Sequence, residues 1–204
     1  MIRKLLSLFA FLGTFLFAGA LHAQAVAPDA FVRQLSDEVL QSIKSDQAVQ
    51  GGDVGRIRAL VDSKVLPHVN FQRMTATVVG RPWRTATPQQ QQRLQEEFKT
   101  LLVRTYAGAL TQVKNQTIAL KPFRGNAADP EVVVRTEVRG GNEPVQLDYR
   151  LEKAGDAWKI YDVNVAGVWM VEQYRSSFAQ EIAAGGIDGL IARLAERNKS
   201  GGKG

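Results

Sequence analysis

The chain has 204 residues, of which 45% are hydrophobic and 23% are charged, and it contains no cysteine and only two histidines. This composition excludes a disulfide-stabilised scaffold and a zinc site of the usual ligands, so stability must come from packing. The formal net charge of +6 comes from scattered Lys and Arg residues without a long basic run, which argues against a nucleic-acid-binding protein.

The N-terminus is typical of a secretory signal peptide. Arg3 and Lys4 precede an uncharged, mostly apolar run over 5–18, and small residues suitable for cleavage follow up to Ala25. An uncleaved anchor is the alternative, but the run is shorter than the roughly 20 residues that a spanning helix needs. We therefore expect residues 1–25 to be a signal peptide that directs export of the protein.

The expected mature chain divides into a helical half, a strand-rich quarter and a helical tail. Apolar residues at helical spacing predict helices over 31–43 and 57–65, and Asn70 is a suitable N-cap for a third helix through Val79. We expect a single domain over 26–197, followed by a disordered tail over 198–204 that is rich in Gly, Lys and Ser.

The strongest helix signal begins at Thr87. A cap residue, Pro88 at the first helical position and Gln90 three residues after the cap form a capping-box pattern. Apolar residues keep helical spacing from Leu94 to Val113. This pattern predicts a long helix that contributes to the core.

From Thr117 the period changes to two, which indicates strands. The expected strands are 117–121, 132–138, 145–152 and 158–165. After Gly167 the helical period returns, and Gly185-Gly186 is expected to end that helix before a final short one over 187–194. These elements predict an α+β fold, in which a curved four-stranded antiparallel sheet carries helices over its concave face and can enclose a conical cavity.

Catalytic residues are scarce in this sequence. His68 is the only histidine outside the expected signal peptide, and no nucleophile elbow, P-loop or dinucleotide motif is present. Asp148 alternates onto a polar strand face, where solvation is expected. Asp162 is expected to share the face of Trp158 and Ile160 as a buried structural carboxylate, with a proton-transfer role as the alternative.

Two long blocks of the chain resemble one known family. They are VQLDYRLEKAGDAWKIYDVNVAGVWMVEQYRSSF (145–178) and HVNFQRMTATVVGRPWRTATPQQQQRLQEEFKTLLVRTYAGAL (68–110), and GGIDGLIARL (185–194) follows them. The family is that of the periplasmic phospholipid-binding proteins of the lipid-asymmetry maintenance system, also called the MlaC or toluene-tolerance family. The resemblance departs at Asn70, where the family usually has aspartate, and at Trp169, where it has a small polar residue.

This resemblance implies a fold related to the nuclear-transport-factor-2 cone and a function in lipid transport. The protein would carry a phospholipid as cargo, without a cofactor or metal. Its partners would be an inner-membrane ABC transporter complex with a lipid-binding subunit and an outer-membrane lipoprotein/porin complex. We expect a monomer that is not an enzyme.

The expected acyl-chain pocket is lined by apolar residues on the inward faces of the sheet and helices. Ordinary core packing is the alternative for each position. The candidates are Phe71, Met74, Val78, Leu102, Tyr106, Val132, Val134, Val138, Val145, Leu147, Tyr149, Val163, Val165, Val168 and Val171.

Three further hypotheses remain open from the sequence. An isomerase-like or dehydratase-like enzyme on the same cone would act through Asp162, and an envelope scaffold would fill the cone with its own side chains. Trp169 is expected on the polar side of its helix, as an anchor for a membrane or partner or as a cap on a neighbouring helix.

Overall fold

A computed structural model of the protein describes residues 26–200, so the predicted signal peptide over 1–25 lies outside the described residues. The helical elements are α1 (Pro28–Ser45), α2 (Gln47–Gln50), α3 (Val54–Leu60), the π-helical turn η1 (Val61–Val65), the 3₁₀ turns η2 (Leu66–His68) and η3 (Arg81–Arg84), α4 (Phe71–Val79), α5 (Pro88–Thr111) and α6 (Met170–Lys199). The strands are β1 (Thr117–Leu120), β2 (Glu131–Val134), β3 (Thr136–Arg139), β4 (Val145–Ala154), β5 (Ala157–Val165) and β6 (Val168–Trp169).

Helix boundaries follow the capping signals in the sequence. The Thr87 hydroxyl accepts a hydrogen bond from the Gln90 amide at 3.2 Å, and the Gln90 side chain accepts one from the Thr87 amide at 3.0 Å. This completes the predicted capping box of α5. The Asn70 side chain likewise accepts the Arg73 amide at the start of α4.

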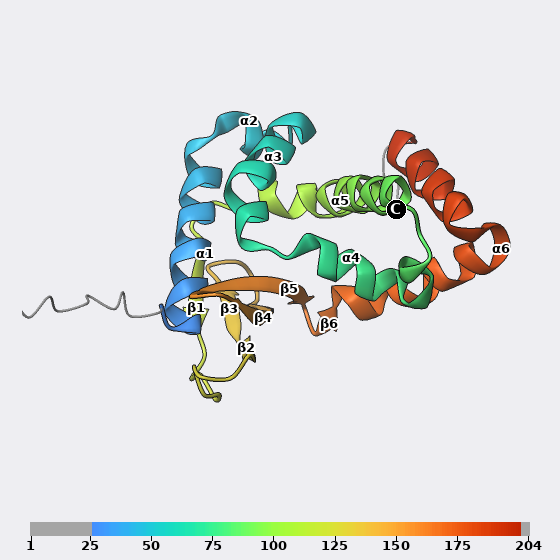
Figure 1. The fold of residues 1–204 in the computed structure, drawn as a ribbon. Helices are drawn as coiled ribbons and strands as arrows, with labels where there is room; N and C mark the ends of the chain where they lie inside the picture. Colours follow the sequence, from blue (N-terminus) through green and yellow to red (C-terminus); the bar gives the residue numbers. More distant parts are fainter. Residues whose placement is uncertain (1–25, 201–204) are drawn as a thin grey trace, which may run out of the picture.

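The fold is α+β, as predicted, but the antiparallel sheet has six strands and not four. Its order is β1-β3-β4-β5-β6, and β2 also pairs with β4. The predicted strand over 132–138 is divided at Arg135 into β2, which pairs with β4, and β3, which pairs with both β1 and β4. The two-residue β6 adds an edge next to β5. Figure 1 shows the sheet beside α1, whereas α6 begins next to β5 and β6 and extends from there to the opposite end of the molecule.

Helix α6 contains the predicted break. Gly186 has φ 66° and ψ −166°, so the helix bends sharply there. The chain remains helical through Lys199, two residues beyond the predicted domain end. Asn198 is buried and donates hydrogen bonds to the carbonyl and the carboxylate of Glu97, which attaches the end of α6 to α5.

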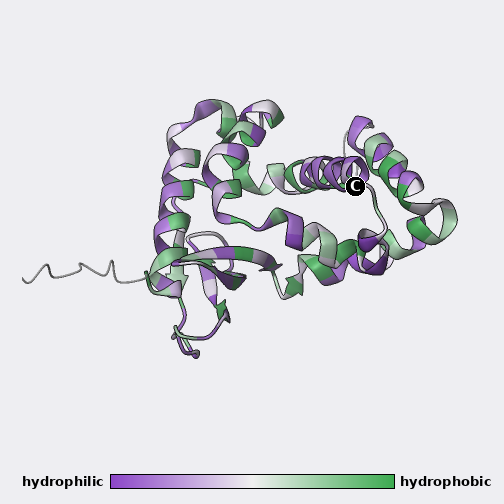
Figure 2. Cartoon of the chain, in the orientation of Figure 1, coloured by the Kyte–Doolittle hydropathy of each residue, from purple (hydrophilic) through white to green (hydrophobic). Residues whose placement is uncertain are grey.

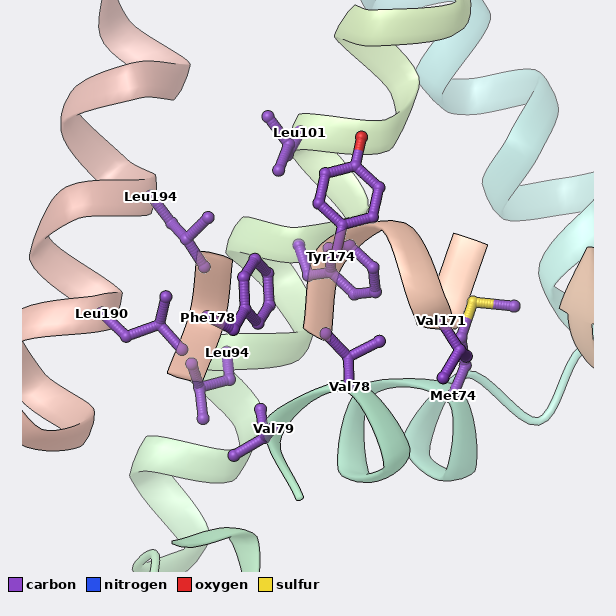
Figure 3. Packing of buried hydrophobic residues seen from close by; sticks show 11 residues of the cluster. Met74, Val78, Val79, Leu94, Leu101, Val171, Tyr174, Phe178, Leu190 and Leu194 are labelled. Atoms are coloured by element: carbon purple, nitrogen blue, oxygen red, sulfur yellow. The ribbon is translucent and has the colours of Figure 1, made fainter. Parts of the chain in front are cut away.

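The hydrophobic core consists of three clusters. The helix cluster joins α4, α5 and α6 (Figure 3). Within it, the ring centroid of Phe98 lies 5.2 Å from that of Tyr174 and 5.2 Å from that of Phe178. The sheet cluster packs Val32 and Leu35 of α1 against β2, β4 and β5. The N-terminal cluster joins α1, α2 and α3 to the second half of α5. Figure 2 shows hydrophobic and hydrophilic residues alternating along these helices, as amphipathic packing requires.

Candidate functional site

The strand pairing defines an inner face of the sheet. Paired residues project to the same side, so Leu147 shares a face with Val165, Tyr149 with Val163, and Leu151 with Ile160. Val132 and Val134 of β2 pair with Leu151 and Tyr149 and therefore lie on this face too. Because the sheet cluster contains residues of this face together with residues of α1, the inner face is the one that α1 covers.

A β-bulge at Tyr161 changes the alternation of β5. Arg150 pairs with Asp162, whereas the next residue, Leu151, pairs with Ile160, so Tyr161 is an extra residue in its strand. Asp162 therefore lies on the outer face with Arg150. The expectation that Asp162 shares the face of Trp158 and Ile160 is wrong, because a one-residue insertion exchanges the two faces of all residues beyond it.

Five of the candidate pocket residues are buried in the hydrophobic core. Met74, Val78 and Val171 are buried in the helix cluster, and Val132 and Val134 are buried in the sheet cluster. Their contacts are ordinary core packing in this structure, and a contact with cargo stays a prediction.

Eight candidates are only partly buried, and they come from both layers. Leu102 and Phe71 pack against the helix cluster, and Tyr149 and Val163 pack against the sheet cluster. The other four are Tyr106, Val138, Leu147 and Val165. The two remaining candidates, Val145 and Val168, are 41% and 50% exposed.

The helix cluster and the sheet cluster share almost no contacting side chains. Within residues 26–200, Val69 is the one side chain that packs against both of them. A domain of this size usually has one contiguous core. Apolar side chains of both layers, among them Leu102 and Val163, are only partly buried, and a site for an apolar chain needs such surface.

Tyr149 is a partly buried residue of the inner face whose side chain carries a polar group. Burial raises the pKa of its phenol to about 12, although hydrogen bonds with Ser36 and Thr136 oppose the increase. Burial also raises the pKa of Tyr106, and the electrostatic interaction with Tyr174 raises it further. Both phenols are therefore neutral at ordinary pH, so they add no charge to the apolar surface.

Asp162 has a structural environment. Its carboxylate accepts the amides of Val163 at 2.9 Å and Val171 at 3.1 Å, and the Arg150 guanidinium at 2.9 Å. Desolvation raises the pKa of this carboxyl, and the three hydrogen bonds and the Arg150 charge oppose that increase. Because the Val171 amide belongs to the first turn of α6, Asp162 caps this helix from the neighbouring strand.

Trp169 lies at the N-cap position of α6 and is half-buried. The guanidinium carbon of Arg150 lies 3.9 Å from the centre of its indole ring, a cation–π arrangement. Trp169 therefore packs on the charged group that holds Asp162, and not on the polar side of a helix as predicted.

Asp148 is buried at 3% exposure, so the expected solvated position is wrong. Its carboxylate accepts the amide of Thr136 at 3.1 Å. Thr136 follows the break between β2 and β3, where its amide would otherwise lack a ladder partner. The carboxylate supplies the missing acceptor.

Two surface hollows lie outside this region. One of about 410 Å³ opens beside Val133, Arg135 and Tyr161, and one of about 360 Å³ lies where α4 ends beside α6. Of the candidate pocket residues only Val132 borders either hollow. Among residues 26–200 no helix is long and apolar enough to cross a membrane, and no group of side chains is suited to hold a metal ion.

The sequence did not predict that α1 packs against the inner face of the sheet and so forms part of the candidate site. Ser36 and Val39 of α1 reach the inner face beside Tyr149 and the sheet cluster. The apolar stripe of α1 is visible in the sequence, but it does not say which surface the stripe covers.

Comparisons with known proteins agree with this architecture. A family model described as MlaC protein matches residues 33–196. The intermembrane phospholipid transport system binding protein MlaC of Haemophilus influenzae is 26% identical over 172 residues, which cover 82% of this chain and 80% of that protein. The toluene tolerance protein ttg2D of Pseudomonas putida is 28% identical over 184 residues, which cover 86% and 85%.

A solved structure is also similar. It is a phospholipid-binding protein from Ralstonia solanacearum in complex with a phospholipid, and it is 48% identical with a TM-score of 0.83. The match covers 86% of this chain and 98% of that chain. Because the family model spans most of the sequence, the protein belongs to the MlaC family, as the resemblance of its sequence blocks indicates.

Proposed function

We propose that this protein binds a phospholipid and carries it between the outer and inner membranes, maintaining outer-membrane lipid asymmetry. The observation that carries this proposal is the relative from Ralstonia solanacearum, which has the same fold at 48% identity and holds a phospholipid. The curated relatives are named for intermembrane phospholipid transport and for toluene tolerance.

The acyl chains would lie against the inner face of the sheet, between it and the helices that pack beside it. Each buried methylene contributes about 0.8 kcal/mol, so two chains of roughly 16 carbons would cost on the order of 20–25 kcal/mol in water. The partly buried apolar residues of the two layers supply the surface that offsets this cost. A fold related to the nuclear-transport-factor-2 cone would allow the layers to separate around the chains.

The location and partners form part of the proposal. A signal peptide over 1–25 would place the protein in the periplasm. An outer-membrane lipoprotein/porin complex and an inner-membrane ABC transporter complex would load and unload it. The direction of transfer would be set by these partners, because a carrier that bound lipid far more tightly than a bilayer does could not release it.

The enzyme alternative has little support, because the Asp162 carboxylate is already occupied by three N–H donors. The scaffold alternative predicts a protein without cargo, and lipid analysis separates it from the carrier.

Leu147→Arg tests the inner face directly. Leu147 is partly buried there, so an arginine would place a charge against the acyl chains, and we expect bound phospholipid to fall by at least about tenfold. The matched control is Val133→Arg, because Val133 lies on the outer face of β2 and is 39% exposed. Lipid would be extracted from both proteins after purification without detergent and quantified by mass spectrometry.

We expect the control to keep its lipid and both proteins to keep a cooperative thermal transition. If folded Leu147→Arg protein carries as much lipid as the control, the acyl chains do not lie on this face. Val134→Arg is a poorer test, because Val134 is 1% exposed and its replacement would disrupt the core.

A further inference from the structure

A cationic pocket is present at the end of the molecule away from the sheet. Helix α4 ends at Gly80, whose φ of 74° turns the chain into η3, and this turn lies beside α6 (Figure 1). The hollow between them has a volume of about 360 Å³. It is lined by Ala76, Thr77, Gly80, Arg81, Trp83, Arg84 and Arg175.

The charge of this pocket is uncompensated. Three of the lining residues are arginines, and none of the lining residues is acidic. Within residues 26–200, Arg81, Arg84 and Arg175 form no ion pair with a carboxylate, whereas Arg73 and Arg150 each contact two. Arg175 donates one hydrogen bond, at 3.2 Å, to the carbonyl of Thr77. Most of the guanidinium donors thus remain available for an anion.

The arginines come from two separate parts of the chain. Arg81 and Arg84 occupy one short turn, which Gly80 and Pro82 shape, and Arg175 reaches the same hollow from α6. Like charges repel, so their convergence without acidic neighbours has a cost that an anionic ligand would remove. Guanidinium groups suit phosphate in particular, because their planar donors can bind two oxygens at once.

The position of Trp83 indicates that the phosphate belongs to a membrane lipid. Its ring packs in part against the helix cluster, so it is held in place at the border of the hollow while remaining partly exposed. Tryptophan beside arginine is the combination that prefers the head-group level of a bilayer, where the ring meets the apolar boundary and the cations meet phosphate.

We propose that this pocket binds the phosphate of an anionic phospholipid at a bilayer surface and holds the protein against the membrane. The bound head group belongs to the membrane and is distinct from the transported cargo. The proposal goes beyond the carrier function, since a protein that keeps its cargo could still lack this contact.

The test is flotation with vesicles of phosphatidylcholine alone and of phosphatidylcholine mixed with phosphatidylglycerol. We expect protein purified from the periplasm to float with the mixed vesicles and not with the neutral ones. Each basic residue at an anionic surface contributes roughly fivefold, so Arg81→Gln/Arg84→Gln/Arg175→Gln should weaken partitioning by about a hundredfold.

The matched control removes the same charge elsewhere. Arg33, Arg124 and Arg135 are exposed, and none of them lines this hollow. Replacing these three by glutamine should change partitioning by less than about threefold, because charges beyond a Debye length of the surface contribute little. Trp83→Phe, at the border of the same pocket, should weaken vesicle binding without a change in charge.

Several results would overturn the proposal. Equal losses in the two triple variants would show that attraction follows net charge alone. Absence of wild-type binding to mixed vesicles would remove the membrane contact altogether. Vesicle binding that survives the pocket changes, with loss of binding to a membrane-protein partner, would assign the pocket to that protein. Phospholipid extracted from each variant reports cargo independently, so failure here is distinguishable from failure of the carrier function.

Discussion

At the scale of single residues, the buried carboxylates Asp148 and Asp162 have structural roles, because backbone and side-chain N–H groups donate hydrogen bonds to them. Asp162 caps α6 and holds Arg150, and Asp148 supplies the acceptor that the break before Thr136 removes from the ladder. Buried carboxylates in a strand often suggest chemistry. Here the N–H groups that donate to these carboxylates account for their burial, and the apolar inner face remains the predicted binding site.

Tyr149 offers a pH test of burial on the inner face. Because its pKa is raised to about 12 from the ordinary value near 10, the stability it contributes is complete below pH 10 and is lost as pH rises through 12. In a phenolate absorbance titration, we expect one of the four tyrosines to ionise near pH 12 and Tyr149→Phe to lose that step.

Tyr161→Phe is the matched control, because the Tyr161 hydroxyl donates to the Glu131 carboxylate on the opposite face. The step near pH 12 should persist in this variant. A wild-type titration in which every tyrosine ionises together near pH 10 would show that Tyr149 is accessible to water.

At the scale of elements, the sequence predicted the helices better than the sheet. Capping residues and apolar spacing placed the starts of α4 and α5 and the kink at Gly186, because these signals are local. The break at Arg135 and the bulge at Tyr161 interrupt runs whose alternation looks continuous in sequence. Both depend on pairing with distant strands, so the strand count and the face of Asp162 were predicted wrongly.

At the kink in α6, we expect replacement of Gly186 to destabilise the protein and replacement of the neighbouring Gly185 to be tolerated. The φ of 66° and ψ of −166° at Gly186 are essentially restricted to glycine, so Gly186→Ala should lower the free energy of unfolding by about 1–3 kcal/mol. A new Cβ at Gly186 or at Gly185 would meet no atom within 4 Å, so backbone conformation alone separates the two positions.

Gly185→Ala is the control and should be neutral or stabilising by up to about 1 kcal/mol, since alanine is the better helix former. Urea unfolding of both variants measures the difference. Equal midpoints would mean that the chain straightens at this point without cost.

At the scale of the whole molecule, the separation of the helix and sheet clusters is the feature that supports cargo binding. The apolar faces of the sheet and helices could be predicted from the sequence. Residues of the core and residues that line a pocket recur at the same spacing, however, so the sequence does not separate them. Val134 and Leu147 are both inward-facing, yet one is closed into the core and the other remains partly open. Only the packing of distant elements distinguishes them, and a contact between these side chains and lipid stays a prediction.

The most direct test of the central claim is native mass spectrometry of the protein purified from the periplasm without detergent, followed by identification of the released ligand. We predict a mass shift equal to one phospholipid, which an organic extract would contain in stoichiometric amount. A homogeneous, folded protein with the mass of the bare chain and an extract free of phospholipid would contradict the carrier function.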